Sequence, residues 1–443
     1  MKQMLLLLAC GFACLSCPAQ DAKLNSMAGQ ELPALVSTYK ALHAAPELSG
    51  HEEKTSALLA ERLRALGYDV TDHIGKYENS DWKGYGIVAI LKNGSGPTVL
   101  VRADMDALPV EEKTGLPYAS KVRTKDDAGA DVPVMHACGH DIHVTAMIGY
   151  AKVLAELKDR WHGTLMLVGQ PAEEKVGGAK AMLADGLYAR FGKPDYAIAL
   201  HDGPSLAGTV SYTPGYALSS ATSVDVTMRG RGAHGSAPQA SKDPIVLAAQ
   251  YIMAIQTIVS RERSPFDPAV VTVGSIHGGT KHNIIPDDVH LQLTVRTYKE
   301  EVRQQVLASL KRIANGLAEA AGVPADRMPI VEVSESTMAT YNNPEMTARV
   351  AAALKRELGA GNAIEAPPAM ASEDFGYFGG EDHAIPSVMF TVGAIDAERM
   401  EASRKSGTPL PSLHSSLFYP APEATIRTAV EAMTAAVLEL MKK

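Results

Sequence analysis

Apolar and polar positions follow two different rhythms along the chain. From about residue 26 to 215, helical spacing as in "EEKTSALLAERLRALGY" alternates with the short apolar runs "GIVAIL", "TVLVRAD", "GTLMLVGQ" and "YAIALHD". Runs of aliphatic residues that end in polar ones are typical of buried strands. Their alternation with helices predicts an α/β layered sheet.

The rhythm changes after about Ala221. "TSVDVTMRGRG", "AVVTVGSIHGG" and "VHLQLTVRTY" read as strands, while "DPIVLAAQYIMAIQTIVSRE" and "EEVRQQVLASLKRIANGLAEAAG" have helical spacing. This order predicts a small α+β sandwich with its helices on one face of an antiparallel sheet. After about Met328 we expect the chain to rejoin the first domain through "MPIVEVSE", a helix from Pro344 to Leu358, the strand "SVMFTVGA" and a helix from about Pro422. The expected divisions are 1–19, 20–216, 217–328 and 329–443, with the third inserted between two parts of one larger domain.

The N-terminus predicts export from the cytoplasm. Lys2 precedes the apolar run "MLLLLACGFACL", and small residues follow from Cys17 to Ala19, where we expect a signal peptide to be cleaved. That run is too short to span a bilayer, and we expect no later segment to approach the length of a transmembrane helix. The expected location is the periplasm or the exterior, with a lipid-anchored lipoprotein as the alternative. The net charge of −8 argues against nucleic acid as a partner.

Cysteine usage leaves one thiol unexplained. Three of the four cysteines lie in the predicted signal peptide, so the mature chain retains only Cys138 and has no intramolecular disulfide. A buried structural cysteine, a nucleophile, an intermolecular bridge and a metal ligand all remain open.

Polar residues follow three of the predicted strands, and ligands bind at the carboxyl ends of strands in open α/β sheets. These residues are Asp104 and Asp106, Glu173 and Glu174, and His201 and Asp202. Cys138 and His140 precede a predicted helix for which Asp141 is the expected N-cap, and His414 lies in a distant loop. Each alone has an ordinary reading as a cap, a turn or a surface histidine, but together they supply N, S and O ligands for two metal ions. Thiolate and imidazole ligands favour zinc.

At this point the sequence resembles the co-catalytic metallopeptidase and aminoacylase family, in the amidohydrolase branch of hippurate, N-acyl-amino-acid and auxin-conjugate hydrolases. The matching stretches cover essentially the mature chain in the family's order: "LHAAPELSGHEEKTS", "RADMDALPVEEKTGLPY", "MHACGHDIHVTAM", "GQPAEEKVGGAKAM", "ALHDGP", "GRGAHGSAPQASKDPI", "GGTKHNIIPD", "VRTY" and "SEDFGYF".

The resemblance implies a mixed-sheet metallopeptidase-type catalytic domain and an inserted α+β domain that forms a homodimer. It implies two divalent ions, zinc first, with manganese, cobalt and nickel as alternatives. Glu173 would be the general base, His234 would stabilise the oxyanion, often in the site of the other subunit, and Asn283 and Arg296 would hold the substrate. The implied metal ligands are Cys138, His140, Glu174, His201 and His414.

Some positions depart from the family pattern. Asp104 stands where many relatives outside this branch have a histidine ligand, and Cys138 would supply the missing ligand. Asp106 has either a ligand-orienting or a structural role. "KDDAGADVPV" is longer than in many relatives, and Asp202 replaces a commonly apolar residue, so the acyl group preferred by relatives does not transfer.

The expected function is metal-dependent hydrolysis of the amide bond of N-acyl amino acids or related small amides and peptides. The alternatives are an exported metallo-dipeptidase or carboxypeptidase, a metal-free amidase with Cys138 as nucleophile, and a non-catalytic peptide-binding protein.

Overall fold

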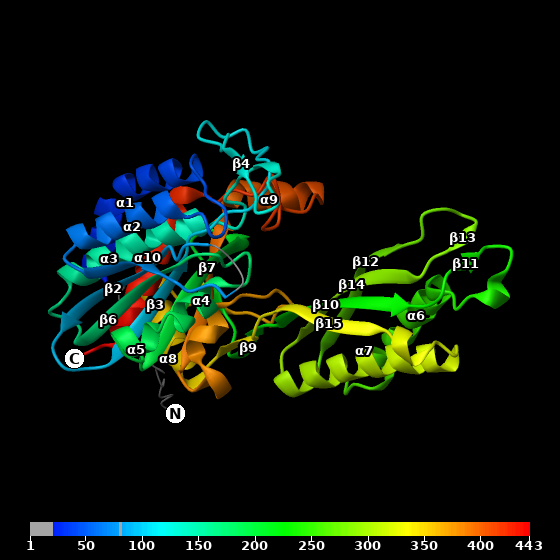
Figure 1. Ribbon diagram of the computed structural model, residues 1–443. Coiled ribbons are helices and arrows are strands. Elements are labelled where there is room, and N and C mark those ends of the chain that lie inside the picture. The colour runs from blue at the N-terminus through cyan, green and yellow to red at the C-terminus, as the bar shows by residue number, and fades with distance from the viewer. Residues whose placement is uncertain (1–20, 79–81) are drawn as a thin grey trace, which may run out of the picture.

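The computed structural model describes residues 21–78 and 82–443. The expected signal peptide, residues 1–19, lies outside the described residues. Figure 1 shows a large lobe built from both ends of the chain and a smaller lobe built from its middle, joined by extended connections. The small lobe is therefore inserted between two parts of the large lobe, as the sequence predicts.

The large lobe contains a mixed sheet of eight strands. Its four central strands run parallel, which aligns their carboxyl ends at one edge. Across the sheet the order is β1 (Asp69–Ile74), β2 (Gly86–Asn93), β6 (Gly163–Gln170), β3 (Thr98–Asp104), β7 (Tyr196–Leu206), β18 (Ser387–Ile395), β8 (Val210–Tyr212) and β17 (Ala363–Glu365).

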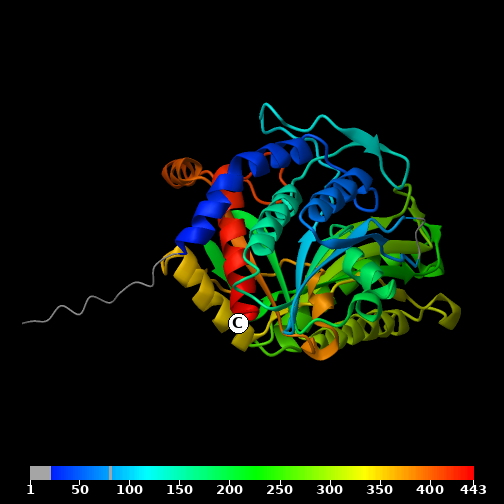
Figure 2. The same cartoon turned by 90° about the vertical axis from the view of Figure 1, so that its left-hand side faces the viewer.

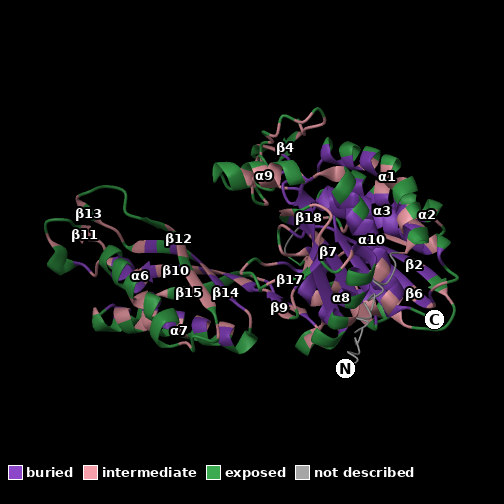
Figure 3. Ribbon diagram, turned by 180° about the vertical axis from the view of Figure 1, so that it is seen from behind, coloured by how far each residue is buried: buried purple, intermediate pink, exposed green. Residues whose placement is uncertain are grey.

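Helices cover both faces of this sheet, so its central strands are buried nearly throughout (Figures 2 and 3). One face packs against α1 (Ala22–His43), α2 (Glu53–Ala65), α3 (His140–Glu156), α8 (Pro344–Leu358) and α10 (Pro422–Leu440). The other packs against α4 (Gly178–Ala184), α5 (Leu187–Phe191) and the 3₁₀ helix η3 (Phe375–Gly379). The rim carries α9 (Ala397–Ser406), η4 (Glu381–His383) and a hairpin of β4 (Arg123–Lys125) and β5 (Asp131–Pro133).

The small lobe is the predicted α+β sandwich with its own apolar core. Its antiparallel sheet has the order β12 (Ala269–Gly278), β14 (Asp288–Thr297), β10 (Ser220–Arg229) and β15 (Ile330–Ser336). Helices α6 (Pro244–Arg261) and α7 (Glu300–Ala320) pack on it. Short elements complete the lobe: β11 (Ala233–His234), η1 (Pro238–Ala240), β13 (Ile284–Ile285) and η2 (Ala325–Arg327).

The return to the large lobe comes later than the sequence predicts. "MPIVEVSE" forms β15, which pairs with β10 in the small sheet, so the expected boundary at residue 328 is wrong. Alternating apolar residues suit an edge strand of either sheet, and only the pairing partner distinguishes the two.

The two connections between the lobes pair with each other. β9 (Gly215–Leu218) runs antiparallel to β16 (Thr340–Asn342), so the chain leaves and re-enters the large lobe as a two-stranded ribbon.

One described helix, α6, is long and apolar enough to cross a membrane by length and composition alone. The sequence-based expectation that no later segment reaches that length is therefore wrong. A third of its apolar window is buried, and Leu247, Tyr251 and Ile255 pack into the core of the small lobe.

Candidate metal centre

The chemistry-bearing residues predicted from the strand ends meet at one edge of the sheet. β6, β3 and β7 are neighbours, and they bring Glu173, Asp104 and His201 to the same edge. His201 does not end its strand as expected, because β7 continues to Leu206. It lies beyond the last residue pair that β7 makes with β3.

The five predicted metal ligands form one continuous cluster. The Cys138 sulfur lies 3.3 Å from Nε2 of His414 and 3.6 Å from Nε2 of His201. Oε2 of Glu174 lies 3.5 Å from Nε2 of His414, and its Oε1 lies 3.9 Å from Nε2 of His140. The fold thus brings together a thiol, three imidazoles and a carboxylate.

Local backbone geometry sets these positions. Gly139 is the N-cap of α3, in a left-handed conformation, and His140 is the first residue of the helix. The expectation that Asp141 is the N-cap is therefore wrong: Asp141 lies in the first turn, and its carboxylate contacts Nδ1 of His43 at 2.7 Å. His414 also has a positive φ, 67°, and its backbone N–H donates to the carbonyl of Ala137, which holds it beside Cys138.

The donor set fits divalent metal ions. Nε2 of His140 and Oε1 of Glu174 are buried, and neither has a hydrogen-bond partner among the described residues. Buried polar atoms are normally paired, and a cation between them would satisfy both. Burial raises the pKa of the Cys138 thiol, and it raises that of Glu174 to about 7. A bound cation would offset the cost of ionising both groups.

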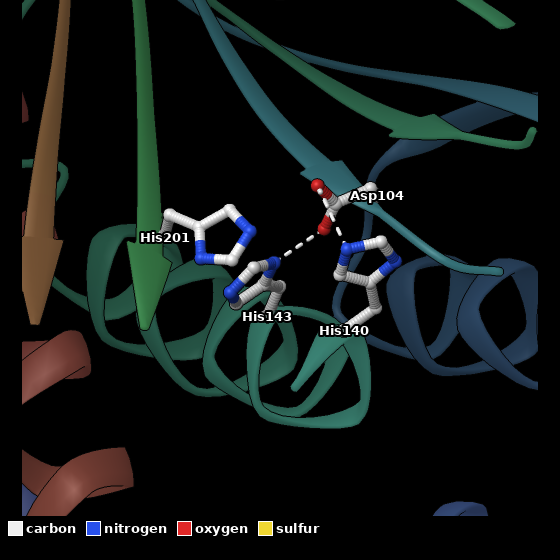
Figure 4. A group of neighbouring side chains, drawn as sticks. All are labelled: Asp104, His140, His143 and His201. Carbon is white, nitrogen blue, oxygen red and sulfur yellow. Dashed lines mark hydrogen bonds and ion pairs between the residues drawn. The ribbon is translucent and has the colours of Figure 1, made fainter. Parts of the chain in front are cut away.

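A second group of buried side chains backs this cluster (Figure 4). Asp104 contacts Nδ1 of His143, whose Nε2 lies 3.2 Å from the Asp202 carboxylate. Asp104 also lies 3.6 Å from Nε2 of His140. Sequence reasoning missed His143, although its spacing of three residues from His140 on a helix puts both on one face.

Two buried carboxylates hold the backbone of the loop that carries Glu173 and Glu174. Asp106 accepts hydrogen bonds from the backbone N–H groups of Glu173 at 3.1 Å and Glu174 at 3.0 Å. Glu52 accepts one from the N–H of Ala172 at 2.8 Å. Three consecutive N–H groups are thus fixed, which supports an orienting role for Asp106.

The buried guanidinium of Arg102 pairs with three carboxylates, two of which lie near Glu173. It pairs with Glu373 at 2.6 Å, with Asp374 at 3.1 Å and with Asp104 at 2.5 Å. Glu373 and Asp374 each place an oxygen within 4.8 Å of Glu173. Burial first, and then the Glu373 carboxylate, raise the pKa of Glu173 well above its ordinary value.

A cavity of about 480 Å³ opens over the cluster between the two lobes, and Arg296 of the small lobe lines it. Nη1 of Arg296 donates to the carbonyl of Met370 at 3.0 Å. The rest of the lining is mostly apolar, and it also includes Glu173, Cys138, His201 and His414.

The structure does not bring His234 and Asn283 to this cavity. Both lie at the β11–β13 end of the small lobe, which points away from the large lobe in Figure 1. The backbone N–H of Gly235 donates to the carbonyl of Asn283 at 2.8 Å. Nδ1 of His234 accepts a hydrogen bond from the backbone N–H of Ser236, which leaves Nε2 to carry the proton.

Comparison with known proteins agrees with this architecture. Residues 100–408 match the family model of peptidase family M20/M25/M40. The chain belongs to this family. Its relatives include a hippurate hydrolase of Campylobacter jejuni, 39% identical over 76% of this chain and 82% of that protein. An N-acetyl-L-cysteine deacetylase of Bacillus subtilis is 37% identical over 78% of this chain and 77% of that protein.

A solved structure of the family extends the likeness to the fold. A dinuclear metal binding peptidase of Bacillus subtilis from the M20 family superimposes with a TM-score of 0.72 and 26% identity, covering 92% of this chain and 98% of that one. The predictions of family, fold class and metal-dependent hydrolase are thus confirmed. Family membership also speaks against a metal-free thiol amidase and a non-catalytic binding protein. The roles of individual site residues stay predictions.

Proposed function

We propose that this protein hydrolyses the amide bond of N-acyl amino acids, releasing a carboxylic acid and a free amino acid. The observation that carries the proposal is the position of Glu173. It lines the cavity immediately beside the cluster of ligands, while the adjacent Glu174 contacts His414 and His140. One carboxylate is thereby available to move protons and the other to bind metal.

The chain's own residues account for the proton transfers. Divalent ions bound by Cys138, His140, Glu174, His201 and His414 would supply Lewis acidity that activates water and polarises the substrate carbonyl at neutral pH. Glu173 accepts the proton that the attacking water releases and delivers it to the amine nitrogen as the C–N bond breaks. Arg296 pairs with the carboxylate of the amino-acid part through its planar fork. We propose zinc as the metal, with manganese, cobalt and nickel as alternatives.

We also propose that the protein is a homodimer through the small lobe. On α6, Ile245, Val246 and Met253 are 45%, 52% and 71% exposed, and Ile276 on the edge strand β12 is 50% exposed. An exposed apolar helix beside an open strand edge favours self-association. In a dimer, His234 and Asn283 of one subunit would complete the cavity of the other, with Nε2–H of His234 donating to the oxyanion.

The dimer has its own test. Met253→Glu places a charge in the proposed interface and should convert the dimer to a monomer in sedimentation velocity, with loss of turnover. A wild-type protein that sediments as an active monomer contradicts this part of the proposal.

Glu173→Gln tests the function. The amide keeps the size of the side chain but cannot accept the proton, so turnover should fall roughly 10²- to 10⁴-fold. The metal content, measured by elemental analysis, should equal that of the wild type. Near-normal turnover of N-acyl amino acids by the variant would rule out Glu173 as the base.

A carboxypeptidase is the second candidate, because the chain is 35% identical to a thermostable carboxypeptidase of Saccharolobus solfataricus over 78% of its length. Both substrate types carry the carboxylate that Arg296 would bind. Comparing kcat/KM for N-acyl amino acids with that for peptides of the same C-terminal residue separates them. Hydrolysis of only non-carboxylated amides would remove the role of Arg296.

We propose, finally, that the protein is exported to the periplasm or the exterior, as Lys2 and the apolar run after it predict. Mass spectrometry of the mature N-terminus tests this proposal. A start near residue 20 supports cleavage, a lipid-modified cysteine supports a lipoprotein, and an intact Met1 in the cytoplasm contradicts export.

A further inference from the structure

A second, smaller cavity shares one lining residue with the main one. It encloses about 90 Å³, and Glu174 borders both cavities. Arg296 lines only the main cavity. A substrate whose carboxylate pairs with Arg296 therefore has its amino-acid part in the main cavity. Its acyl group, on the other side of the scissile amide bond, would need a separate space near the cluster, and the smaller cavity beside Glu174 offers one.

Apolar side chains form the floor of the small cavity. Leu48, Ala107, Leu108 and Pro109 contribute to its lining. Leu48 and Ala107 belong to a small apolar cluster of their own. Two hydrogen bonds of 3.0 Å with Met135 fix the backbone of Leu108 at this cavity. Such a floor suits an uncharged acyl group.

The β4–β5 hairpin closes the rim of this cavity with Asp126 and Asp127. Asp127 accepts hydrogen bonds from the indole N–H of Trp82 at 3.0 Å and contacts Nε2 of His51 at 3.3 Å. Asp126 accepts from the backbone N–H groups of Ala128 and Ala130. The contacts of Asp127 anchor the hairpin to the large lobe.

We propose that this cavity is the acyl subsite, and that Leu108 and the β4–β5 hairpin restrict it to small uncharged acyl groups while the larger cavity accepts bulky amino acids. The inference rests on the proposed function. It assigns this chain a preference opposite to that suggested by hippurate, which combines a large benzoyl group with glycine.

The test is a matrix of kcat/KM values for the metal-loaded wild type. The kcat/KM for N-acetyl-phenylalanine should exceed the values for N-benzoyl-phenylalanine and N-succinyl-phenylalanine by roughly ten-fold or more, because the larger acyl groups do not fit the small cavity. Lys175 also borders the cavity, so the succinyl compound tests whether its ammonium recruits an anionic acyl group. A wild type that prefers either larger acyl group overturns the inference.

Variants locate the preference. Leu108→Ala should raise the benzoyl-to-acetyl ratio of kcat/KM at least five-fold, and Asp127→Ala, which releases the hairpin from Trp82 and His51, should shift it in the same direction. Lys125→Ala, an exposed hairpin substitution that lines neither cavity, should leave the ratio unchanged. If the Leu108 and Asp127 variants fold and keep the wild-type benzoyl-to-acetyl ratio, the acyl subsite is wrong and the proposed function still stands. Absence of hydrolysis of every compound by the metal-loaded wild type overturns the proposed function instead.

Discussion

Asp106→Asn is a sharp test of how the loop bearing Glu173 and Glu174 is held. The substitution keeps the shape of the side chain and replaces one acceptor oxygen by an NH₂ group. In the wild type, Oδ1 accepts from the Glu173 N–H, while Oδ2 accepts from the Glu174 N–H at 3.0 Å and from the Ser49 hydroxyl at 2.6 Å. Asp106 is 1% exposed, so water cannot replace a lost partner.

The magnitude follows from the atoms that lose an acceptor. The Ser49 hydroxyl can rotate and accept from the new NH₂ group, but the Glu174 N–H cannot, so one buried donor is left unpaired. That costs about 1–3 kcal/mol. Because Glu174 is a predicted metal ligand and Asp106 holds its backbone N–H, we expect metal affinity to fall roughly 10- to 100-fold.

The assay is a competition titration of the metal against a chromogenic chelator, together with kcat at saturating metal. Weaker metal binding with partial recovery of kcat at high metal concentration is the expected result. Ser49→Ala is the matched control, since it removes only the hydroxyl and should change metal affinity much less. If Asp106→Asn binds metal as tightly as the wild type and turns over equally fast, the orienting role of Asp106 is wrong.

Three further outcomes are expected. Chelation should abolish turnover and re-addition of the divalent ion should restore it, as followed by product release; activity that survives complete metal removal contradicts the metal centre. Burial raises the pKa of Glu357 to about 7 from 4.5, so its neutral form stabilises the fold below about pH 4.5 and this contribution is lost as the pH rises through 7. At pH 8 the Glu357→Gln variant should therefore have a free energy of unfolding up to about 2 kcal/mol higher than the wild type, and a higher Tm, with little difference at pH 4. Equal Tm values at pH 8 contradict this. Gly50→Ala should lower stability by about 1 kcal/mol or more in thermal denaturation, because φ is +79° and a Cβ would lie 2.3 Å from the Trp82 ring; an unchanged Tm would show that Trp82 can move away.

The sequence is sufficient to predict the convergence of strand ends, because parallel neighbouring strands present their carboxyl ends at one edge. It also predicts α8 from Pro344 to Leu358, where Asn343 caps the helix by accepting from the Met346 N–H. These features depend on local patterns and on one topological rule.

What could not be predicted depends on distant partners. The buried network around Arg102 joins residues 271 and 272 positions apart in the chain, and no spacing rule relates them. His143 was missed because its partners, Asp104 and Asp202, come from two other elements. The position of His234, outside the cavity of its own chain, follows from the direction in which the small lobe points.

The paired connections β9 and β16 constrain how the two lobes can rotate. Because the two strands are hydrogen-bonded to each other, they would move as one connection, which would be the pivot for a rotation of the small lobe. Arg296 pairs with Ala221, close to that pivot, whereas His234 lies at the opposite end of the small lobe. Since displacement grows with distance from an axis, a small rotation would leave Arg296 almost in place while His234 moves farther. The proposed carboxylate-binding residue and the proposed oxyanion donor of one chain would therefore move by different amounts.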